Sequence, residues 1–390
     1  MNKKSVLIVD DEKLNRKILF FTLKKYNYNI LEAENGLVAK KITEDQAIDL
    51  IILDLTMPIM DGFEFLNWIK NTKEYKNIPI IVSSALSDIE SIKKALNFGC
   101  FDYLEKPLSN NILNIQLPLK VKNAINYYNL LKTTIENRNK ILEQKKLLER
   151  ELELAAELQR TLLPSNIPQE YNGFEISFYY QPSTQLGGDF YDFNIFQNSL
   201  QLLIADVSGH GTPSALITAA IKSFYNSILD MGGMSPNNLL DKLNSNVYKL
   251  VGGTDFFVTA LYCDININEK KLLFSNAGHH PPIIYSAKKN TILKIDAPSF
   301  FLGLLPTSKY KNYDINIDSG DIILFYTDGI IEAQNYNKEQ FGKKRLQATI
   351  SNNKDKSPKA IIENILKELG LFLGTRKPDD DITLIVIKIK

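Results

Sequence analysis

Aspartates recur where apolar runs end in this sequence, a placement that could support metal-dependent phosphoryl chemistry. In the first third of the chain, Asp10 and Asp11 follow the run VLIV, and Asp54 follows IIL. Apolar runs without alternation predict buried parallel strands, whose carboxyl ends meet at one edge of a sheet. Carboxylates gathered there repel one another unless a cation lies among them, and oxygen-only ligands suit Mg²⁺. An aspartate carboxylate can also accept a phosphoryl group itself.

Two more polar residues end predicted strands of the same sheet. Ser84 follows the run IPIIV, and Lys106 closes DYLEK. An ammonium group and a hydroxyl opposite the acids could hold the oxygens of a phosphoryl group.

The combination of VDDE, ILDLTMPIMDG, SSA and FDYLEKP closely resembles response-regulator receiver domains across residues 4–120. The resemblance implies a histidine kinase as phosphodonor and a Lys106–Pro107 bond that is often cis in the family. It also implies a set of roles: phosphoacceptor Asp54; Mg²⁺ ligands Asp10, Asp11, Asp54 and the Thr56 carbonyl; phosphoryl contacts Ser84 and Lys106; switch aromatic Tyr103.

A second set of aspartates lies in the C-terminal half, each at the edge of a strand-like run beside a glycine or a turn. They are Asp189, Asp206, Asp328 and the run Asp379–Asp381. Converging carboxylates favour hard divalent cations. Two such cations about 3.5–4 Å apart could share a water, lower its pKa and direct it at a phosphorus. No side-chain nucleophile is then needed, which fits the lack of a G-x-S-x-G motif and of a cysteine beside a histidine in the sequence.

The stretch IADVSGHGTPSAL permits other interpretations. It is no Walker loop, because no G-K-[ST] follows. As a dinucleotide fingerprint, Gly209-x-Gly211-x-x-Ser214 lacks the third glycine, and another helix is expected next instead of a parallel strand. A general base at His210 would need a nucleophile or an orienting acid that the sequence does not reveal. A nucleotide-binding transferase is therefore the weakest candidate.

The C-terminal motifs, from AAELQRTLLP to DDIT, resemble the metal-dependent PPM protein phosphatases over about residues 155–390. They are most similar to the bacterial branch that acts on anti-anti-sigma factors. The resemblance implies an αββα sandwich with two Mn²⁺ or Mg²⁺ ions and a metal-bound water as the nucleophile. It assigns metal ligation to Asp189, Asp206, the Val207 carbonyl, Asp328 and Asp380, with Gly188, His210, His279 and Asp381 around them. Asp206 would bridge the metals, and Asp380 is preferred to Asp381 because it begins DDIT.

Two departures from the family pattern are visible. His280 stands where the usual GHPPP has a proline, and we expect only a local effect on the loop. The arginine that holds the substrate phosphate in eukaryotic relatives is also missing, which leaves phosphate recognition unassigned.

The elements that must position these residues fall into three predicted segments. Residues 1–122 alternate strands and helices, which predicts a doubly wound, flavodoxin-like α/β receiver with a five-stranded parallel sheet. Residues 123–163 predict a helical, coiled-coil-like linker with a break in register, although a solvated helix packed on its own domain is the plainer alternative. Pro118 should kink or end the linker helix near its start. Residues 164–390 predict antiparallel sheets with helices outside.

The bulk composition adds limits. The formal net charge of +1 gives no general electrostatic reason to bind nucleic acid or membrane, and the two distant cysteines exclude a disulfide framework. The N-terminal apolar run is shorter than the roughly 7–15 residues of a signal peptide, so we expect a cytoplasmic protein.

Together these features predict a signalling relay in one chain. Phosphorylation of Asp54 by a histidine kinase would control a serine/threonine phosphatase that acts on a phosphorylated anti-anti-sigma factor. The chain would form a homodimer through the linker and make no direct contact with DNA. The alternative is a receiver-controlled adaptor whose phosphatase-like domain is catalytically silent.

Overall fold

The computed structural model describes residues 3–85, 89–164, 170–171, 173–209 and 211–390. His210 therefore lies outside the described residues. The chain divides into two compact units, residues 1–146 and 147–390, and each is described by itself below.

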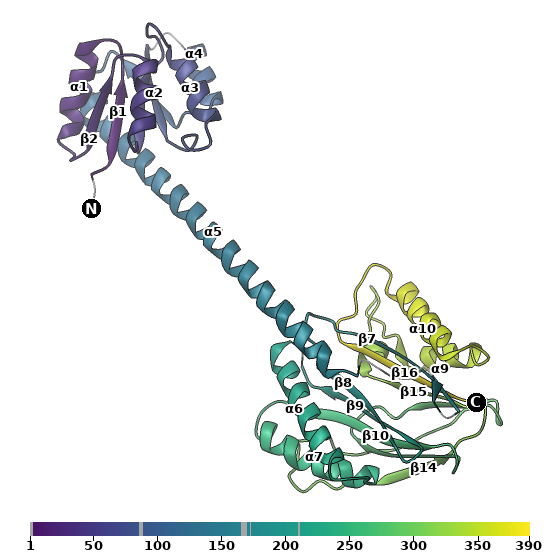
Figure 1. The fold of residues 1–390 in the computed structure, drawn as a ribbon. Coiled ribbons are helices and arrows are strands. Elements are labelled where there is room, and N and C mark those ends of the chain that lie inside the picture. Colours follow the sequence, from purple (N-terminus) through teal and green to yellow (C-terminus); the bar gives the residue numbers. More distant parts are fainter. Residues whose placement is uncertain (1–2, 86–88, 165–169, 172, 210) are drawn as a thin grey trace. The chain divides into compact units, whose positions relative to one another are not determined.

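In the N-terminal unit, the described strands form a parallel sheet in the order β2-β1-β3-β4-β5. Helices cover both of its faces (Figure 1). The strands are β1 (Ser5–Val9), β2 (Asn29–Ala33), β3 (Leu50–Asp54), β4 (Ile80–Ala85) and β5 (Asp102–Lys106); the helices are α1 (Lys13–Lys24), α2 (Gly36–Asp45), α3 (Gly62–Asn71) and α4 (Ile89–Asn97). The predicted receiver fold is confirmed.

Side chains of the interior strand β1 point alternately to the two faces of the sheet and pack into a core on each face. Leu7 and Val9 pack into one core with α2 and α3, whereas Val6 and Ile8 pack into the other with α1 and the start of α5. Both sets of side chains are fully buried, so an apolar run without alternation was the correct signal for this strand.

A single helix, α5 (Leu117–Leu162), follows the receiver and reaches the C-terminal unit. It is preceded by a π-helical turn, Ile112–Gln116, in which the Leu117 N–H donates to the Ile112 carbonyl. Pro118 thus lies in the first turn of α5, next to an irregular segment, as its missing N–H requires. Residues 132–151 are all exposed, although they include five leucine or isoleucine side chains that are 40–63% exposed: Ile135, Ile141, Leu142, Leu147 and Leu148.

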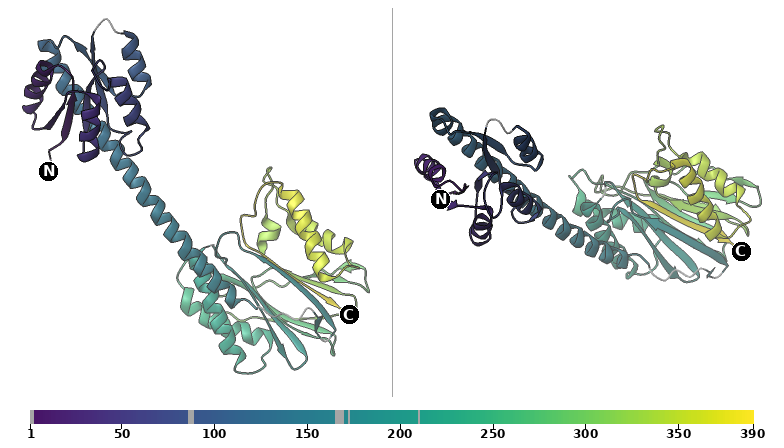
Figure 2. Two further views of the ribbon diagram at one scale, coloured as in Figure 1. Left: turned by 45° about the horizontal axis from the view of Figure 1, so that its top comes forward. Right: turned by 90° about the horizontal axis from the view of Figure 1, so that it is seen from above.

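The described part of the C-terminal unit holds two antiparallel sheets that pack face to face, with helices on both outer sides (Figure 2). The first sheet has the order β14-β11-β10-β9-β8, and the second has the order β13-β12-β15-β16-β7-β6. Their strands are β6 (Glu170–Tyr171), β7 (Phe174–Gln181), β8 (Asp189–Phe196), β9 (Ser199–Val207), β10 (Val258–Asn266), β11 (Lys271–Ala277), β12 (Ile283–Ser286), β13 (Thr291–Ile292), β14 (Asn312–Asn316), β15 (Ile322–Tyr326) and β16 (Ile382–Ile389). The predicted αββα sandwich is confirmed.

Three apolar layers hold this unit together. Side chains such as Leu202 and Ile385 fill the space between the sheets. Helices α6 (Thr212–Leu229) and α7 (Pro236–Val251) pack on the first sheet, and α9 (Gly342–Asn352) and α10 (Pro358–Leu373) pack on the second.

Two helices were not expected from the sequence. Helix α8 (Asp328–Glu332) is a single short turn, too short for a periodic apolar pattern. Helix α9 begins after Phe341 without a side-chain cap, so it has no N-terminal signal in the sequence. Among the described helices, none is long and apolar enough to cross a membrane.

The outer helix α10 offers a test of this layering. We expect Leu369→Ala, at a buried position, to cost about 2–5 kcal/mol of unfolding free energy through lost burial and a residual cavity. Leu371→Ala, on the same helix but 70% exposed, should change it by less than about 0.5 kcal/mol. Calorimetric unfolding of both variants checks this, and equal losses would show that α10 is not seated as described.

Candidate phosphoacceptor and metal sites

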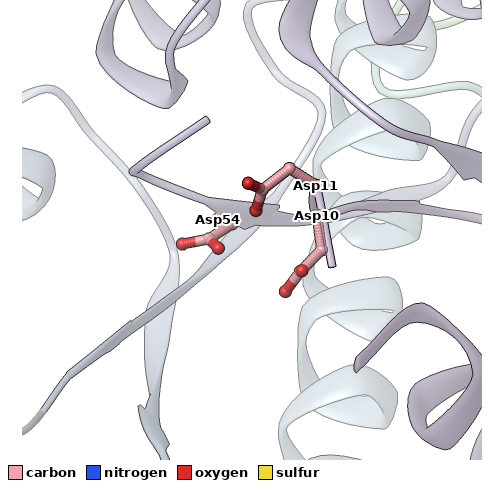
Figure 3. Close-up of side chains that lie close together, drawn as sticks. All are labelled: Asp10, Asp11 and Asp54. Carbon is pink, nitrogen blue, oxygen red and sulfur yellow. The ribbon is translucent and has the colours of Figure 1, made fainter. Parts of the chain in front are cut away.

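The receiver acids meet at the carboxyl edge of the parallel sheet, as predicted. Carboxylate oxygens of Asp10, Asp11 and Asp54 all lie within 4.8 Å of one another (Figure 3). Asp10 and Asp54 are buried, whereas Asp11 is exposed. Such an oxygen-only set, open on one side to water, fits Mg²⁺.

Lys106 faces the same acids from the end of β5. Its Nζ lies 2.9 Å from Asp10 Oδ2 and 2.6 Å from Asp54 Oδ2. Burial raises the pKa of Asp54, and the hydrogen bond and charge of Lys106 oppose that rise. Burial alone would lower the pKa of Lys106, but its bonds to the two carboxylates raise it instead. The lysine therefore stays charged and can also bind an oxygen of a group carried by Asp54.

The remaining predicted receiver residues lie around this edge. The Thr56 N–H donates to Asp54 Oδ1 at 3.4 Å, and Ser84 is buried near the end of β4. Its neighbour Ala85 pairs with Lys106 in the β4–β5 register. Tyr103 is half-buried on β5, with the Lys120 Nζ 5.1 Å from its ring centroid. The Lys106–Pro107 peptide bond is cis.

In the C-terminal unit, strand register brings the first two acids together. Asp189 begins β8 and lies directly opposite Asp206, near the end of β9. The Gly188 carbonyl accepts the Val207 N–H at 3.2 Å. A Cβ at Gly188 would lie 2.7 Å from the Val207 carbonyl oxygen, so only glycine permits this close approach.

The other acids arrive from the second sheet. Asp328 begins α8 directly after β15, and Asp380 precedes β16. A Cβ at Gly329 would lie 2.0 Å from the Asp381 carbonyl oxygen, so α8 packs against the backbone of the DDIT segment. This contact seats the start of α8 against the backbone of Asp380 and Asp381.

Asp206 shows most clearly that the acids converge. Burial raises its pKa to about 8, and the charges of Asp328 and Asp380 add to the rise. Burial likewise raises the pKa of Asp328, with a further contribution from Glu332. Burial and mutual repulsion thus favour the protonated forms of these carboxylates, and a cation placed among them would favour the charged forms instead.

The spacing of this second site differs from that of the receiver. Among the described residues, Asp10, Asp11 and Asp54 are the only acids whose oxygens approach within 4.8 Å as a group of three. The C-terminal acids thus influence one another electrostatically but stand farther apart.

Asp189 is fully buried and accepts two hydroxyl hydrogen bonds. Thr327 Oγ1 and Thr383 Oγ1 donate to its Oδ2 at 2.8 and 2.5 Å. Burial raises its pKa well above the usual range, and the neighbouring Asp206 adds to this. One of its oxygens is therefore committed to the protein, and the other is available toward Asp206.

Asp381 has a backbone-binding role. Its carboxylate accepts the N–H groups of Ser183 at 2.7 Å and Gly188 at 2.5 Å, and it is buried. Asp380, by contrast, is exposed. The geometry therefore favours Asp380 over Asp381 as the residue that faces a metal.

His279 is buried, and burial lowers its pKa to about 3, so its ring is neutral. Its Nδ1 lies 2.8 Å from Thr259 Oγ1, and Thr259 is the β10 partner of Asp206. The backbone of His279 is bound on both sides by the Asn276 side chain. These contacts indicate that His279 positions the loop beside Asp206.

One contact was missed by sequence reasoning. The Gln159 amide, on the last turns of α5, donates to the Gly187 carbonyl at 2.7 Å and accepts the Gly187 N–H at 3.1 Å. It also donates to Thr218 Oγ1 on α6 at 3.1 Å. A polar residue in an amphipathic linker gives no sign that it binds a backbone segment distant in sequence.

Comparison with known proteins identifies a receiver domain and a phosphatase-type domain in this chain. The response regulator receiver domain model matches residues 6–117, and the Stage II sporulation protein E model matches residues 197–390. The phosphoserine phosphatase RsbU of Bacillus subtilis is 33% identical over 240 residues, which cover 62% of this chain and 70% of RsbU. RsbP of the same organism is 30% identical over 187 residues, covering 47% of this chain and 45% of RsbP. The SiaA-PP2C domain of Pseudomonas aeruginosa shares the fold, with a TM-score of 0.56 at 18% identity over 63% of this chain and 99% of that domain.

The fold and sites define a response regulator whose receiver is joined to a PPM-type phosphatase domain. The chain belongs to the family of bacterial phosphatases represented by RsbU.

Gly329 tests the packing that brings the acids together. Gly329→Ala should force α8 away from the DDIT backbone, lower the melting temperature and weaken Mn²⁺ binding by about 10-fold or more, as changes around metal ligands do. Gly370→Ala on α10 is the matched control, because no atom lies within 4 Å of its added Cβ. Unchanged Mn²⁺ affinity in Gly329→Ala, measured by calorimetric titration, would contradict this geometry.

Proposed function

We propose that this chain is a protein serine/threonine phosphatase whose activity is set by phosphorylation of Asp54. The convergence of Asp206, Asp328 and Asp380 on one edge of the sandwich carries this proposal. The substrate would be a phosphoserine or phosphothreonine on a small partner of the anti-anti-sigma type. The names of RsbU and RsbP, both phosphoserine phosphatases, support this class of substrate.

The ligand set would consist of Asp206 between two Mn²⁺ or Mg²⁺ ions, with the Val207 carbonyl, Asp189, Asp328 and Asp380 around them. When bound, the ions would supply an acidified water and neutralise charge on the phosphoryl oxygens. Asp189 would be held in place by its threonine donors, and Asp381 would fix the Gly188 backbone next to it. The protein's part is to place the oxygens, and the bound ions would favour their charged forms.

The receiver site supports the control step. Asp54 would accept the phosphoryl group from a histidine kinase, with Mg²⁺ held by Asp10, Asp11, Asp54 and the Thr56 carbonyl. Lys106 and Ser84 would then bind the phosphoryl oxygens. Tyr103, the switch aromatic, would change position in response to phosphorylation.

Helix α5 would transmit the change in the receiver to the phosphatase domain. Gln159 binds the Gly187 backbone, and the next residue, Gly188, donates to Asp381. Buried Ala156 packs with Leu186 and Ala215 in the same region. A rotation or shift of the helix would therefore reach the metal edge through two hydrogen-bonded steps. The exposed apolar side chains between residues 132 and 151 favour pairing of two such helices in a homodimer.

The rival function is a silent adaptor that only binds its partner. An adaptor would not need four mutually repelling acids, since their burial is costly without cations. Activity separates the two functions directly.

With Mn²⁺, the full chain should hydrolyse p-nitrophenyl phosphate, and Asp328→Ala should lower the rate by more than about 100-fold because a metal ligand is lost. Asp379→Ala is the control: this neighbouring acid is exposed and pairs with Arg376 instead. Equal activity in Asp328→Ala, or an inactive wild type with every divalent ion, would count against the phosphatase.

Receiver control is tested on a phosphorylated anti-anti-sigma protein with and without acetyl phosphate. The phosphodonor should change the rate by about 5-fold or more, a typical coupling between sites, and Asp54→Asn should abolish the change. Gln159→Ala should remove most of the response, whereas Gln144→Ala, exposed in the middle of α5, should retain it. A full response in Gln159→Ala would exclude this route.

A further inference from the structure

The phosphatase domain has an excess of negative charge at its metal edge and lacks an assigned group for the substrate phosphate. Asp206, Asp328, Asp380 and Glu332 all contribute to that charge. A phosphomonoester dianion approaching this edge would be repelled wherever the cations do not reach it. A cationic or hydrogen-bond-donating group beside this edge would offset that repulsion.

His280 is the first such group. Its ring stacks on Tyr326, with centroids 5.7 Å apart and planes inclined by 13°. Tyr326 ends β15, two residues before Asp328, so the imidazole is fixed beside the start of α8. The half-buried ring experiences the charges of Asp328, Glu332 and Lys343.

Lys343 is the second group. It lies in the first turn of α9, and α9 packs against α8, the helix that begins with Asp328. In the part of the chain that the structure describes, no carboxylate lies within ion-pairing distance of its ammonium group. Its surroundings lower its pKa by desolvation even though the residue is largely exposed.

The positive charge of Lys343 does not stabilise the helix in which the residue lies. The N-terminal turn of a helix favours acidic side chains, because the macrodipole is positive there. A lysine in this turn, whose charge acts on the His280 ring, is a cation available to an incoming anion.

We propose that His280 and Lys343 form the phosphate-binding side of the phosphatase site, opposite the metal-binding acids. This inference rests on the proposed function. The ligand is a phosphomonoester dianion, whose outer oxygens would accept from the Lys343 ammonium and from a ring N–H of His280. The histidine that replaces a family proline would thus contribute to substrate binding and not only to the shape of its loop.

The test uses the full chain with p-nitrophenyl phosphate at saturating Mn²⁺ and with inorganic phosphate as a competitive inhibitor. Lys343→Gln should raise both KM and the inhibition constant of phosphate by about 5-fold, with kcat and the Mn²⁺ activation constant nearly unchanged. His280→Gln should act in the same direction, and Lys343→Arg should restore most of the affinity. Lys344→Gln, about 100° farther around the same helix, should have no effect.

A purely structural role of Lys343, neutralising the acids, would instead alter the Mn²⁺ constant and leave phosphate inhibition unchanged, which would overturn the proposal. Calorimetric titration of inorganic phosphate into the Mn²⁺-loaded protein separates this inference from the proposed function. Weaker phosphate binding in Lys343→Gln supports the inference even if the wild type is inactive on the chromogenic substrate. Equal binding in the two proteins overturns it while leaving the phosphatase itself intact.

Discussion

The cost of burying several carboxylates at one sheet edge governs both halves of this protein. In the receiver, Lys106 lies 2.6 Å from Asp54 and 2.9 Å from Asp10, so the acids keep an internal cation. In the phosphatase domain, the pKa of Asp206 rises to about 8 because burial and neighbouring acids act together. The receiver acids are therefore balanced by a lysine of their own fold, whereas neighbouring acids in the phosphatase domain raise the pKa of Asp206. The same constraint thus gives each fold a cluster of acids whose negative charge must be offset.

Backbone contacts, more than side-chain contacts, bring the phosphatase acids together. Asp189 and Asp206 are opposite one another because β8 and β9 pair in that register. The second sheet adds Asp328 through the close packing of Gly329 on the DDIT segment. Asp381 joins the sheets by accepting N–H groups from the residues before β8. Metal ligands placed in this way are pre-positioned by the sandwich itself, so their geometry is linked to its stability.

Much of this architecture could be predicted from the sequence, because its signals are local. Apolar runs without alternation indicated the parallel sheet, and acids at the ends of runs indicated both sites. The missed features depend on contacts between distant residues. Helix α8 is one turn long, and α9 lacks a cap, so neither has a pattern of its own. Gln159 and His280 resemble ordinary linker and loop residues until Gly187 and Tyr326 are found beside them.

The Gln159 contact links the long helix α5 to the backbone segment that precedes Gly188. Its amide satisfies both the N–H and the carbonyl of Gly187, so a small rotation of α5 would leave two backbone groups and the amide without partners. The same amide donates to Thr218 on α6, so the Gln159 side chain binds both the loop before β8 and helix α6. Under the proposed function, this contact one residue away from Gly188 would let a movement of α5 alter the ligand geometry, because the loop before β8 would be either held in place or released.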